Sequence, residues 1–189
     1  MIQTFLSENF RDKSTTGRGA FGCSFTYGTG VEYDEAWPKL IGANNYGLPG
    51  SSNDKICRLA IEYISIAKPD AIFVMWTFEN RREWIDEDGT VLRFKADDVR
   101  KLPGRSNRYK WEEAHFELYN KHWDHYNYSK NKLLLENFCV NTDVKLYQLY
   151  VSDIDHTLMN SYGSDKAHPG KEWHIHVSEN FTKQMVAHT

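Results

Sequence analysis

This sequence has few cysteines, no long apolar run and no large surplus of positive or negative charge. Its 189 residues include three cysteines, Cys23, Cys57 and Cys139, an odd number with no CxxC spacing. This argues against a disulfide framework and a zinc ribbon, and it fits a reducing compartment. No stretch nears the roughly 18 apolar residues of a membrane span, and the N-terminus lacks a secretory signal pattern. We expect no signal peptide, and either a cytoplasmic protein or a virus-encoded product inside a host cell.

The charge balance also narrows the partners. A formal net charge of -3 lacks the basic surplus of a general nucleic-acid binder, so we expect neither nucleic acid nor a membrane as partner. Hydrophobic residues at 40% and aromatic residues at 14% are typical of a globular chain. The length suits a single domain over residues 1–189. Nothing in the sequence indicates the oligomeric state.

Apolar segments of two kinds alternate along the chain. Continuous apolar runs predict strands at 19–23, 71–76 and 144–151, and helical spacing predicts a helix between Ser52 and Pro69. A last helix is predicted from the apolar positions that begin at Trp173. Such alternation predicts a three-layer α/β/α fold with a central parallel sheet of about five strands, and functional residues at the carboxyl ends of the strands.

The middle of the chain is less regular. Residues of about 84–110 are polar and charged, and they read as an insertion with at most a short hairpin near 90–94. Its aromatic and basic residues suit either a wall that stacks on a sugar or acyl group, or a solvated loop. One long helix or two follow over 111–141, with Trp123 and 133–135 on the expected apolar face.

Ser24 lies where the first predicted strand should end, in residues 22–28, which read GCSFTYG. A sharp turn there would lift its hydroxyl above the sheet edge. A serine hydroxyl is a weak nucleophile until a histidine takes its proton, and a carboxylate best orients that histidine. Glycine-flanked serines are also common in ordinary turns. A nucleophile at Ser24 therefore requires partners elsewhere.

Candidate partners occur just before the last predicted helix, where residues 165–169 read DKAHP. The three-residue spacing can place the carboxylate of Asp165 and the imidazole of His168 on one side of a turn. The aspartate would then hold the ring in one tautomer. A structural alternative stays open, because Asp165 could cap a helix and Pro169 commonly opens one.

Taken together and in this order, these motifs resemble the SGNH (GDSL-like) hydrolase family. Residues 22–28 resemble its first block, Gly-Asp-Ser-x-x-x-Gly, and 45–50 resemble its glycine-containing second block. Residues 165–169 match the Asp-x-x-His-Pro of its fifth block, and 173–174 are similar to the Gly-His step that opens its last helix. The resemblance spans nearly the whole chain and implies the flavodoxin-like SGNH hydrolase fold.

The resemblance also implies roles for individual residues. Ser24 would be the nucleophile, His168 the base and Asp165 the residue that orients it. The oxyanion hole would use the backbone N–H groups of Ser24 and Gly50 and a side chain from the third block. Donors of this kind typically supply roughly 3 to 4 kcal/mol each.

The third block departs from the family. Where Gly-x-Asn-Asp is expected, the chain reads TFENR over 77–81, which places Glu79 at the asparagine position. Because a carboxylate would repel an oxyanion, either Asn80 or Arg81 takes the role, or catalysis is weak or altered. Arg81 also suits a substrate carboxylate, unless Glu79 pairs with it. Cys23, in place of the family's aspartate, is outside the triad.

The function that the resemblance implies is a serine esterase or deacetylase. It would hydrolyse a small acyl ester through an acyl-enzyme, with acetyl on a carbohydrate as the favoured case, and would need no cofactor. Two alternatives stay open. One is a non-catalytic SGNH-like module that binds a carbohydrate, protein or nucleic acid, and the other is an acyltransferase.

Histidine pairs raise the question of a metal site. His122 and His125 lie three residues apart, and His174 and His176 lie two apart. Neither pair has the carboxylate spacing of an HExxH motif, so we expect no metal. Segment 153–156 contains a second Asp-His step, which we expect to be a solvated loop.

Overall fold

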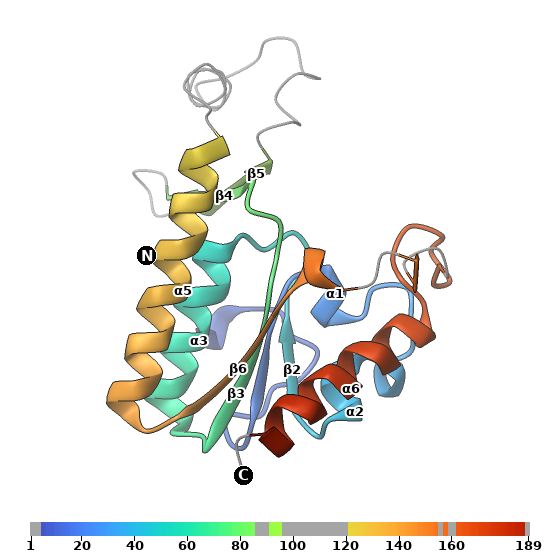
Figure 1. Cartoon of the computed structure of the whole chain (residues 1–189), viewed down its shortest axis with the longest axis horizontal. Coiled ribbons are helices and arrows are strands. Elements are labelled where there is room, and N and C mark those ends of the chain that lie inside the picture. Colours follow the sequence, from blue (N-terminus) through green and yellow to red (C-terminus); the bar gives the residue numbers. More distant parts are fainter. Residues whose placement is uncertain (1–4, 86–90, 96–120, 155–156, 159–161, 188–189) are drawn as a thin grey trace.

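The computed structural model describes residues 5–85, 91–95, 121–154, 157–158 and 162–187 (Figure 1). Its main sheet is parallel throughout and has the order β2 (Asn44–Gly47), β1 (Gly19–Gly22), β3 (Ala71–Trp76) and β6 (Lys145–Tyr150). The predicted fold class is confirmed. Within the described residues this sheet has four strands rather than about five.

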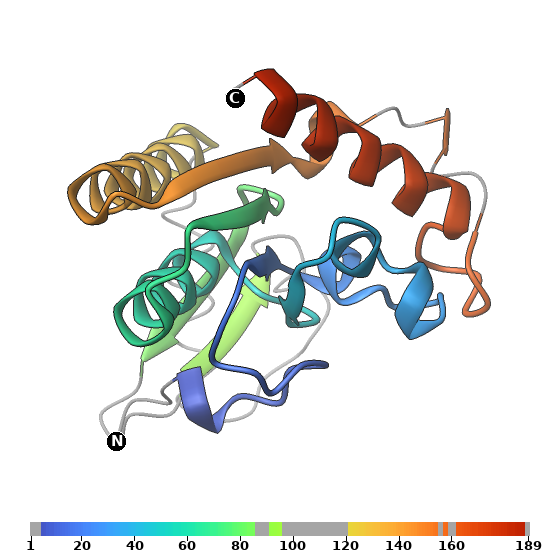
Figure 2. The ribbon, with the colours of Figure 1, turned by 90° about the horizontal axis from the view of Figure 1, so that it is seen from below.

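Helices cover both faces of this sheet (Figure 2). On one face lie α3 and α5, and on the other lie α2 and α6. The bounds of the described helices, including short 3-10 turns, are η1 (Phe5–Ser7), α1 (Ser24–Tyr27), η2 (Tyr33–Glu35), α2 (Trp37–Leu40), α3 (Asn53–Ala67), α5 (Lys121–Thr142), η4 (Val151–Asp153) and α6 (Lys171–Ala187). None of these described helices is long and apolar enough to cross a membrane.

Strand β3 is the centre of the core, because all six of its side chains are buried. Alternate residues of a strand point to opposite faces of the sheet. Ile72, Val74 and Trp76 accordingly join the cluster beneath α3 and α5. Phe73 and Met75 join the cluster beneath α2 and α6. A strand that is apolar at every position, as predicted, is therefore one that lies between two helical layers.

The strand order reverses between β1 and β3. From β1 the chain builds outward to β2 on one side, and then returns to add β3 and β6 on the other. In open α/β sheets, ligands bind outside the carboxyl ends of the strands at such a switch point. Ser24 follows β1 and the segment 77–81 follows β3, so both border the switch point.

Two more strands form a separate antiparallel pair, β4 (Arg81–Ile85) and β5 (Val91–Lys95). The expected hairpin therefore exists, but it begins at Arg81, ahead of the expected insertion. β3 ends at Trp76, as predicted, and a turn separates it from Arg81, which opens β4. Residues 86–90 and 96–120 lie outside the described residues, and with them most of the expected insertion.

The buried face of α5 agrees with the predicted one only in part, because Leu135 is buried as expected but other positions are not. Trp123 is 59% exposed and Leu133 is 61% exposed, although both were expected on the inner face. The buried positions include Asp124, which pairs with Arg82. They also include Asn131, which bonds Asp54 at 2.9 Å. The error arises because polar residues with partners on other elements occupy positions that an apolar pattern cannot reveal.

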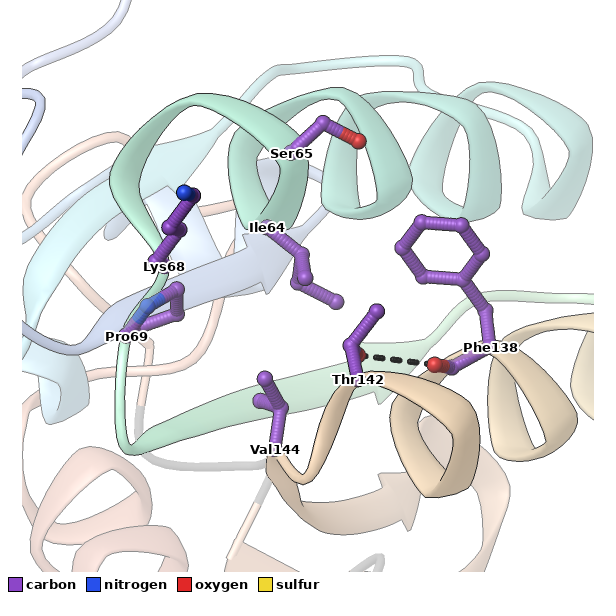
Figure 3. Close-up of a pocket in the computed structure, with 7 residues that line it drawn as sticks. All are labelled: Ile64, Ser65, Lys68, Pro69, Phe138, Thr142 and Val144. Atoms are coloured by element: carbon purple, nitrogen blue, oxygen red, sulfur yellow. Dashed lines mark hydrogen bonds between the residues drawn. The ribbon is translucent and has the colours of Figure 1, made fainter.

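A pocket of about 260 Å³ opens at the end of the sheet where the strands begin (Figure 3). Its lining residues come from the end of α3, the end of α5 and the segments that follow them: Ile64, Ser65, Lys68, Pro69, Phe138, Thr142 and Val144. β3 begins at Ala71 and β6 at Lys145, so this pocket lies at the sheet edge opposite the carboxyl ends. We therefore do not look for catalysis there.

Lys68, in this pocket, ends α3 in the left-handed region with φ 47°. Such a conformation is disfavoured for a residue with a Cβ and free of that penalty for glycine. We expect Lys68→Gly to raise the free energy of unfolding by about 0.5–1 kcal/mol, measured by urea denaturation. Lys68→Ala removes the same side chain but retains the strain, and should bring no gain. Equal stability of the two variants would contradict this account.

Candidate active site

Ser24 opens α1 directly after β1. Cys23 is extended, with φ -96° and ψ -150°, and its carbonyl accepts hydrogen bonds from Thr26 N at 3.1 Å and Tyr27 N at 2.9 Å. Gly28 then ends this single turn in the left-handed region at φ 79°. The sharp strand-to-helix turn expected at Ser24 is therefore present, at the carboxyl end of β1. Ser24 itself is buried.

The second block holds this turn in place. The side chain of Asn45, fully buried in β2, donates to Thr26 O at 3.0 Å and to Tyr27 O at 3.2 Å. Gly47 lies so close that an added Cβ would be 2.3 Å from Tyr27 N. The glycine permits backbone of β2 and α1 to touch, and the asparagine caps the carbonyls of α1. Sequence reasoning noted this block but not its support of the nucleophile turn.

Asp165 and His168 are joined. Asp165 Oδ2 lies 2.6 Å from His168 Nδ1, while Oδ1 accepts the backbone N–H groups of Ala167 at 3.1 Å and His168 at 3.0 Å. The backbone hydrogen bond from His168, with that from its side chain, lowers the pKa of Asp165 to about 2. The carboxylate is thus ionised near neutrality and accepts a hydrogen bond from the Nδ1–H group, which leaves Nε2 as the basic nitrogen.

The loop that carries this pair packs against the loop after α1. Ser164 donates to Gly30 O from its backbone N at 2.7 Å and from Oγ at 3.0 Å. The backbone N–H of Gly163 donates to His168 O at 2.7 Å and closes the loop. A Cβ on Gly163 would lie 2.4 Å from Gly30 O, so only glycine permits this approach. Sequence reasoning missed Gly30 and Gly163, although both flank the motifs.

Phe25, the residue after Ser24, connects the two motifs. Its ring meets the His168 ring edge-on, with centroids 5.9 Å apart, and lies 5.5 Å from the Trp173 ring. Among the described residues, no hydrogen bond joins Ser24 to His168. The structure therefore brings the imidazole beside the nucleophile turn without the final hydrogen bond. Catalytic hydrogen bonds are often long in unliganded structures and tighten around substrate.

The ends of β3 and the start of α3 are bound together by Asn53. Its side chain accepts the N–H of Thr77 at 2.9 Å and donates to Thr77 O at 3.1 Å. This pair fixes the third block next to the loop that contains Gly50, a residue in the left-handed region at φ 77°. Asn53, which the sequence did not single out, thus joins the segment after β3 to the start of α3.

Glu79 is turned toward α5. Its Oε1 lies 3.1 Å from His125 Nδ1, and its side chain is 25% exposed. The turn after β3 continues through Asn80 and closes with a hydrogen bond from Arg81 N to Phe78 O at 3.2 Å. Arg81 does not pair with Glu79; its guanidinium lies over the ring of Phe78, 5.2 Å from the centroid.

Two other histidines, His174 and His125, have structural partners. His174 is buried, and its Nδ1 accepts the backbone N–H of Trp37 at 3.3 Å. His125 contacts Glu79, as above. The part of the chain that the structure describes holds no group of three or more potential metal ligands. Residues 155–156 lie outside the described residues.

No protein-family model matches the chain, and no curated protein matches its sequence. Solved structures do match it. The psychrotrophic esterase EstA from Pseudoalteromonas sp., inhibited by monoethylphosphonate, is 14% identical with a TM-score of 0.44, and the match covers 92% of this chain and 98% of that one.

Two further solved structures match over similar lengths. A protein described as an acylhydrolase from Bacteroides fragilis is 15% identical with a TM-score of 0.41, covering 93% of this chain and 89% of that one. A protein described as lipolytic and of the G-D-S-L family, from Desulfitobacterium hafniense, is 14% identical with a TM-score of 0.39, covering 90% and 99%. The chain is thus similar to structures of esterases and acylhydrolases at low identity.

Proposed function

We propose that this chain is a serine esterase or deacetylase of the SGNH type that removes a small acyl group from an ester. The observation that carries the proposal is the Asp165–His168 pair, 2.6 Å apart, whose ring packs on the residue next to Ser24. A carboxylate, an imidazole and a serine at a strand-to-helix turn are the parts that acyl transfer requires. Ser24 borders the switch point of the sheet, and the ring contact between Phe25 and His168 connects the pair to it.

In the proposed reaction, Ser24 Oγ attacks the ester carbonyl while His168 Nε2 takes its proton. The C–O bond to the alcohol then breaks, and His168 returns the proton to the leaving oxygen. Water, activated by the same imidazole, attacks the acyl-enzyme and releases the acid. Asp165 keeps Nδ1 protonated and stabilises the imidazolium that forms in each step.

The oxyanion hole belongs to the same proposal. We assign the backbone N–H groups of Ser24 and Gly50 as two donors and the side chain of Asn80 as the third. The contact between Glu79 and His125 supports this assignment, because it engages the carboxylate that would otherwise repel the oxyanion. Acetyl on a carbohydrate is the favoured substrate, and the reaction needs no cofactor.

The test is a fluorophosphonate probe, which reacts with an activated serine. We expect it to label the folded protein once, and peptide mass spectrometry to place the label on Ser24. Ser51 and Ser52, which directly follow the second block, provide internal controls and should carry no label. Heat-unfolded protein should not be labelled either. Hydrolysis of p-nitrophenyl acetate should accompany labelling. A folded protein that takes no label would overturn the proposal.

One observation favours a second candidate, a non-catalytic binding module. Glu79 stands where the third block of the SGNH family has its oxyanion asparagine. If Asn80 does not replace that donor, the fold would bind a ligand without turning it over. The same probe separates the two candidates, because a binding module has no activated serine to label.

A further inference from the structure

Arg81 is a buried charge whose hydrogen-bonding capacity is largely unused. Arg81 is 7% exposed, and neither its Nε nor its Nη1 has a hydrogen-bond partner. Among the described residues, no carboxylate forms an ion pair with it, and its recorded contact is the face of Phe78. Proteins rarely bury an arginine without a partner, since the charge loses its hydration. An unpaired buried guanidinium of this kind suits a partner that the described residues do not supply.

The neighbouring charges do not supply that partner. Arg82 points to the other side of β4 and pairs with Asp124 of α5. Glu83, on the same side of the strand as Arg81, is 3.2 Å from Arg58 of α3. Both nearby carboxylates are thus engaged by other arginines. Arg81 is left facing the side of β4 on which α3 lies.

This side adjoins the candidate active site. The ring of Phe78, beneath the guanidinium, meets the ring of Phe25 with centroids 6.1 Å apart. Phe25 in turn meets His168 and follows Ser24. A chain of ring contacts through Phe25 and Phe78 therefore connects the imidazole to Arg81. Phe25 lies just after β1 and Phe78 just after β3, the strands that flank the switch point.

We propose that Arg81 binds a carboxylate group of the substrate, so that the esterase acts on esters that carry a single negative charge. This rests on the proposed function, because it names the substrate class of the same site. A guanidinium offers a planar pair of N–H donors that matches a carboxylate. The rings of Phe25 and Phe78 suit the apolar part of the substrate between its carboxylate and its ester. One arginine in a chain of net charge -3 balances a monoanion better than a phosphate dianion.

The proposal is tested with substrates matched in shape but not in charge. 4-Acetoxybenzoate, which carries its negative charge on the alcohol side of the ester, is compared with the neutral 4-acetoxybenzamide. p-Nitrophenyl hemiglutarate is compared with p-nitrophenyl valerate, which places it on the acyl side. We expect kcat/KM to favour the charged member of at least one pair by about tenfold or more, mainly through KM.

Variants then locate the preference. Arg81→Met should reduce the ratio of the two kcat/KM values to about one, and Arg81→Lys, which keeps the charge but not the planar pair of donors, should leave an intermediate ratio. Because each ratio is taken within one variant, a partial loss of folded protein cancels. Arg18→Met is the matched control: Arg18 pairs with Asp70 at the exposed surface, 2.9 Å away, and the ratio should not change.

A binding measurement separates this inference from the proposed function. Calorimetry with Ser24→Ala, which cannot form an acyl-enzyme, should show tighter binding of 4-acetoxybenzoate than of its amide if the charge lies on the alcohol side. If the charge lies on the acyl side, the same variant should bind the amide of hemiglutarate more tightly than the amide of valerate. If wild-type protein hydrolyses no ester but this preference is present, the proposed function fails and the carboxylate site stands. Equal kcat/KM and equal affinity within both pairs, or a ratio that Arg81→Met leaves unchanged, would overturn the site.

Discussion

Asp165→Asn is expected to lower kcat for p-nitrophenyl acetate about 10⁴-fold while the protein stays folded. The amide retains an oxygen that can accept the N–H groups of Ala167 and His168, so the loop should persist. Its NH₂ group, however, would face His168 Nδ1 and require that nitrogen to accept. The proton then moves to Nε2, and the imidazole can no longer take the proton of Ser24.

Asp153→Asn is the matched control. Asp153 follows β6 in η4 and is exposed, and the same change of chemistry there should leave kcat within about twofold of wild type. Circular dichroism and a urea titration at pH 7 verify that both variants are folded. Ser24→Ala sets the floor of residual activity. If Asp165→Asn keeps more than about a tenth of wild-type kcat, Asp165 does not orient the base.

The pH dependence follows from the same carboxylate. Its pKa is lowered to about 2 by the hydrogen bonds from His168 and Ala167, whereas an aspartate in the unfolded chain has its ordinary pKa of about 3.8. The stabilisation is therefore complete above about pH 4 and is lost as the pH falls toward 2. Asp165 is ionised throughout the range in which an esterase is assayed. Any acidic limb of the rate profile must then come from another group.

The main strands and helices of this protein can be predicted from its sequence, because buried positions recur at the spacing of each element. β3 is apolar at all six positions, and it lies between two helical layers. α3 runs from Asn53 to Ala67 with Ser52 as its N-cap, since Ser52 Oγ accepts the N–H of Lys55 at 3.2 Å. Both features depend on neighbours in the chain, so periodicity and capping are enough to find them.

What the sequence does not predict depends on contacts between distant segments. Asn53 bonds Thr77, and Gly163 packs on Gly30, across separations that no spacing rule covers. Part of the inner face of α5 was assigned wrongly for the same reason, because Asp124 is buried by its partner Arg82. The candidate residues could be named from motifs, but the contacts that hold Asp165 and His168 beside the turn at Ser24 are tertiary. Strands and helices follow from neighbouring residues in the sequence, whereas the arrangement of a site depends on contacts between distant segments.

A buried histidine gives the largest expected effect on stability. His174 is 1% exposed, and its burial lowers its pKa to about 4, with a further contribution from the positive charge of Arg11, while Glu35 acts in the opposite direction. An unfolded histidine binds its proton near pH 6.5, but the folded one does so only near pH 4. The contribution of neutral His174 to the free energy of unfolding is therefore complete above about pH 6.5 and falls as the pH drops toward 4. The loss should reach about 3 kcal/mol, from roughly 1.4 kcal/mol per pKa unit.

Urea denaturation at pH 7.5, 6, 5 and 4 measures this loss, and His174→Gln tests its origin. Glutamine offers an oxygen to the N–H of Trp37, the group that His174 Nδ1 now accepts, but it does not titrate. The variant should be nearly as stable at pH 4 as at pH 7.5, apart from the carboxylates that titrate at the lower end. His176→Gln, on the same helix and only partly buried, should keep the wild-type dependence. If His174→Gln loses stability between pH 6.5 and 5 as steeply as wild type does, the acid sensitivity arises from a group other than His174.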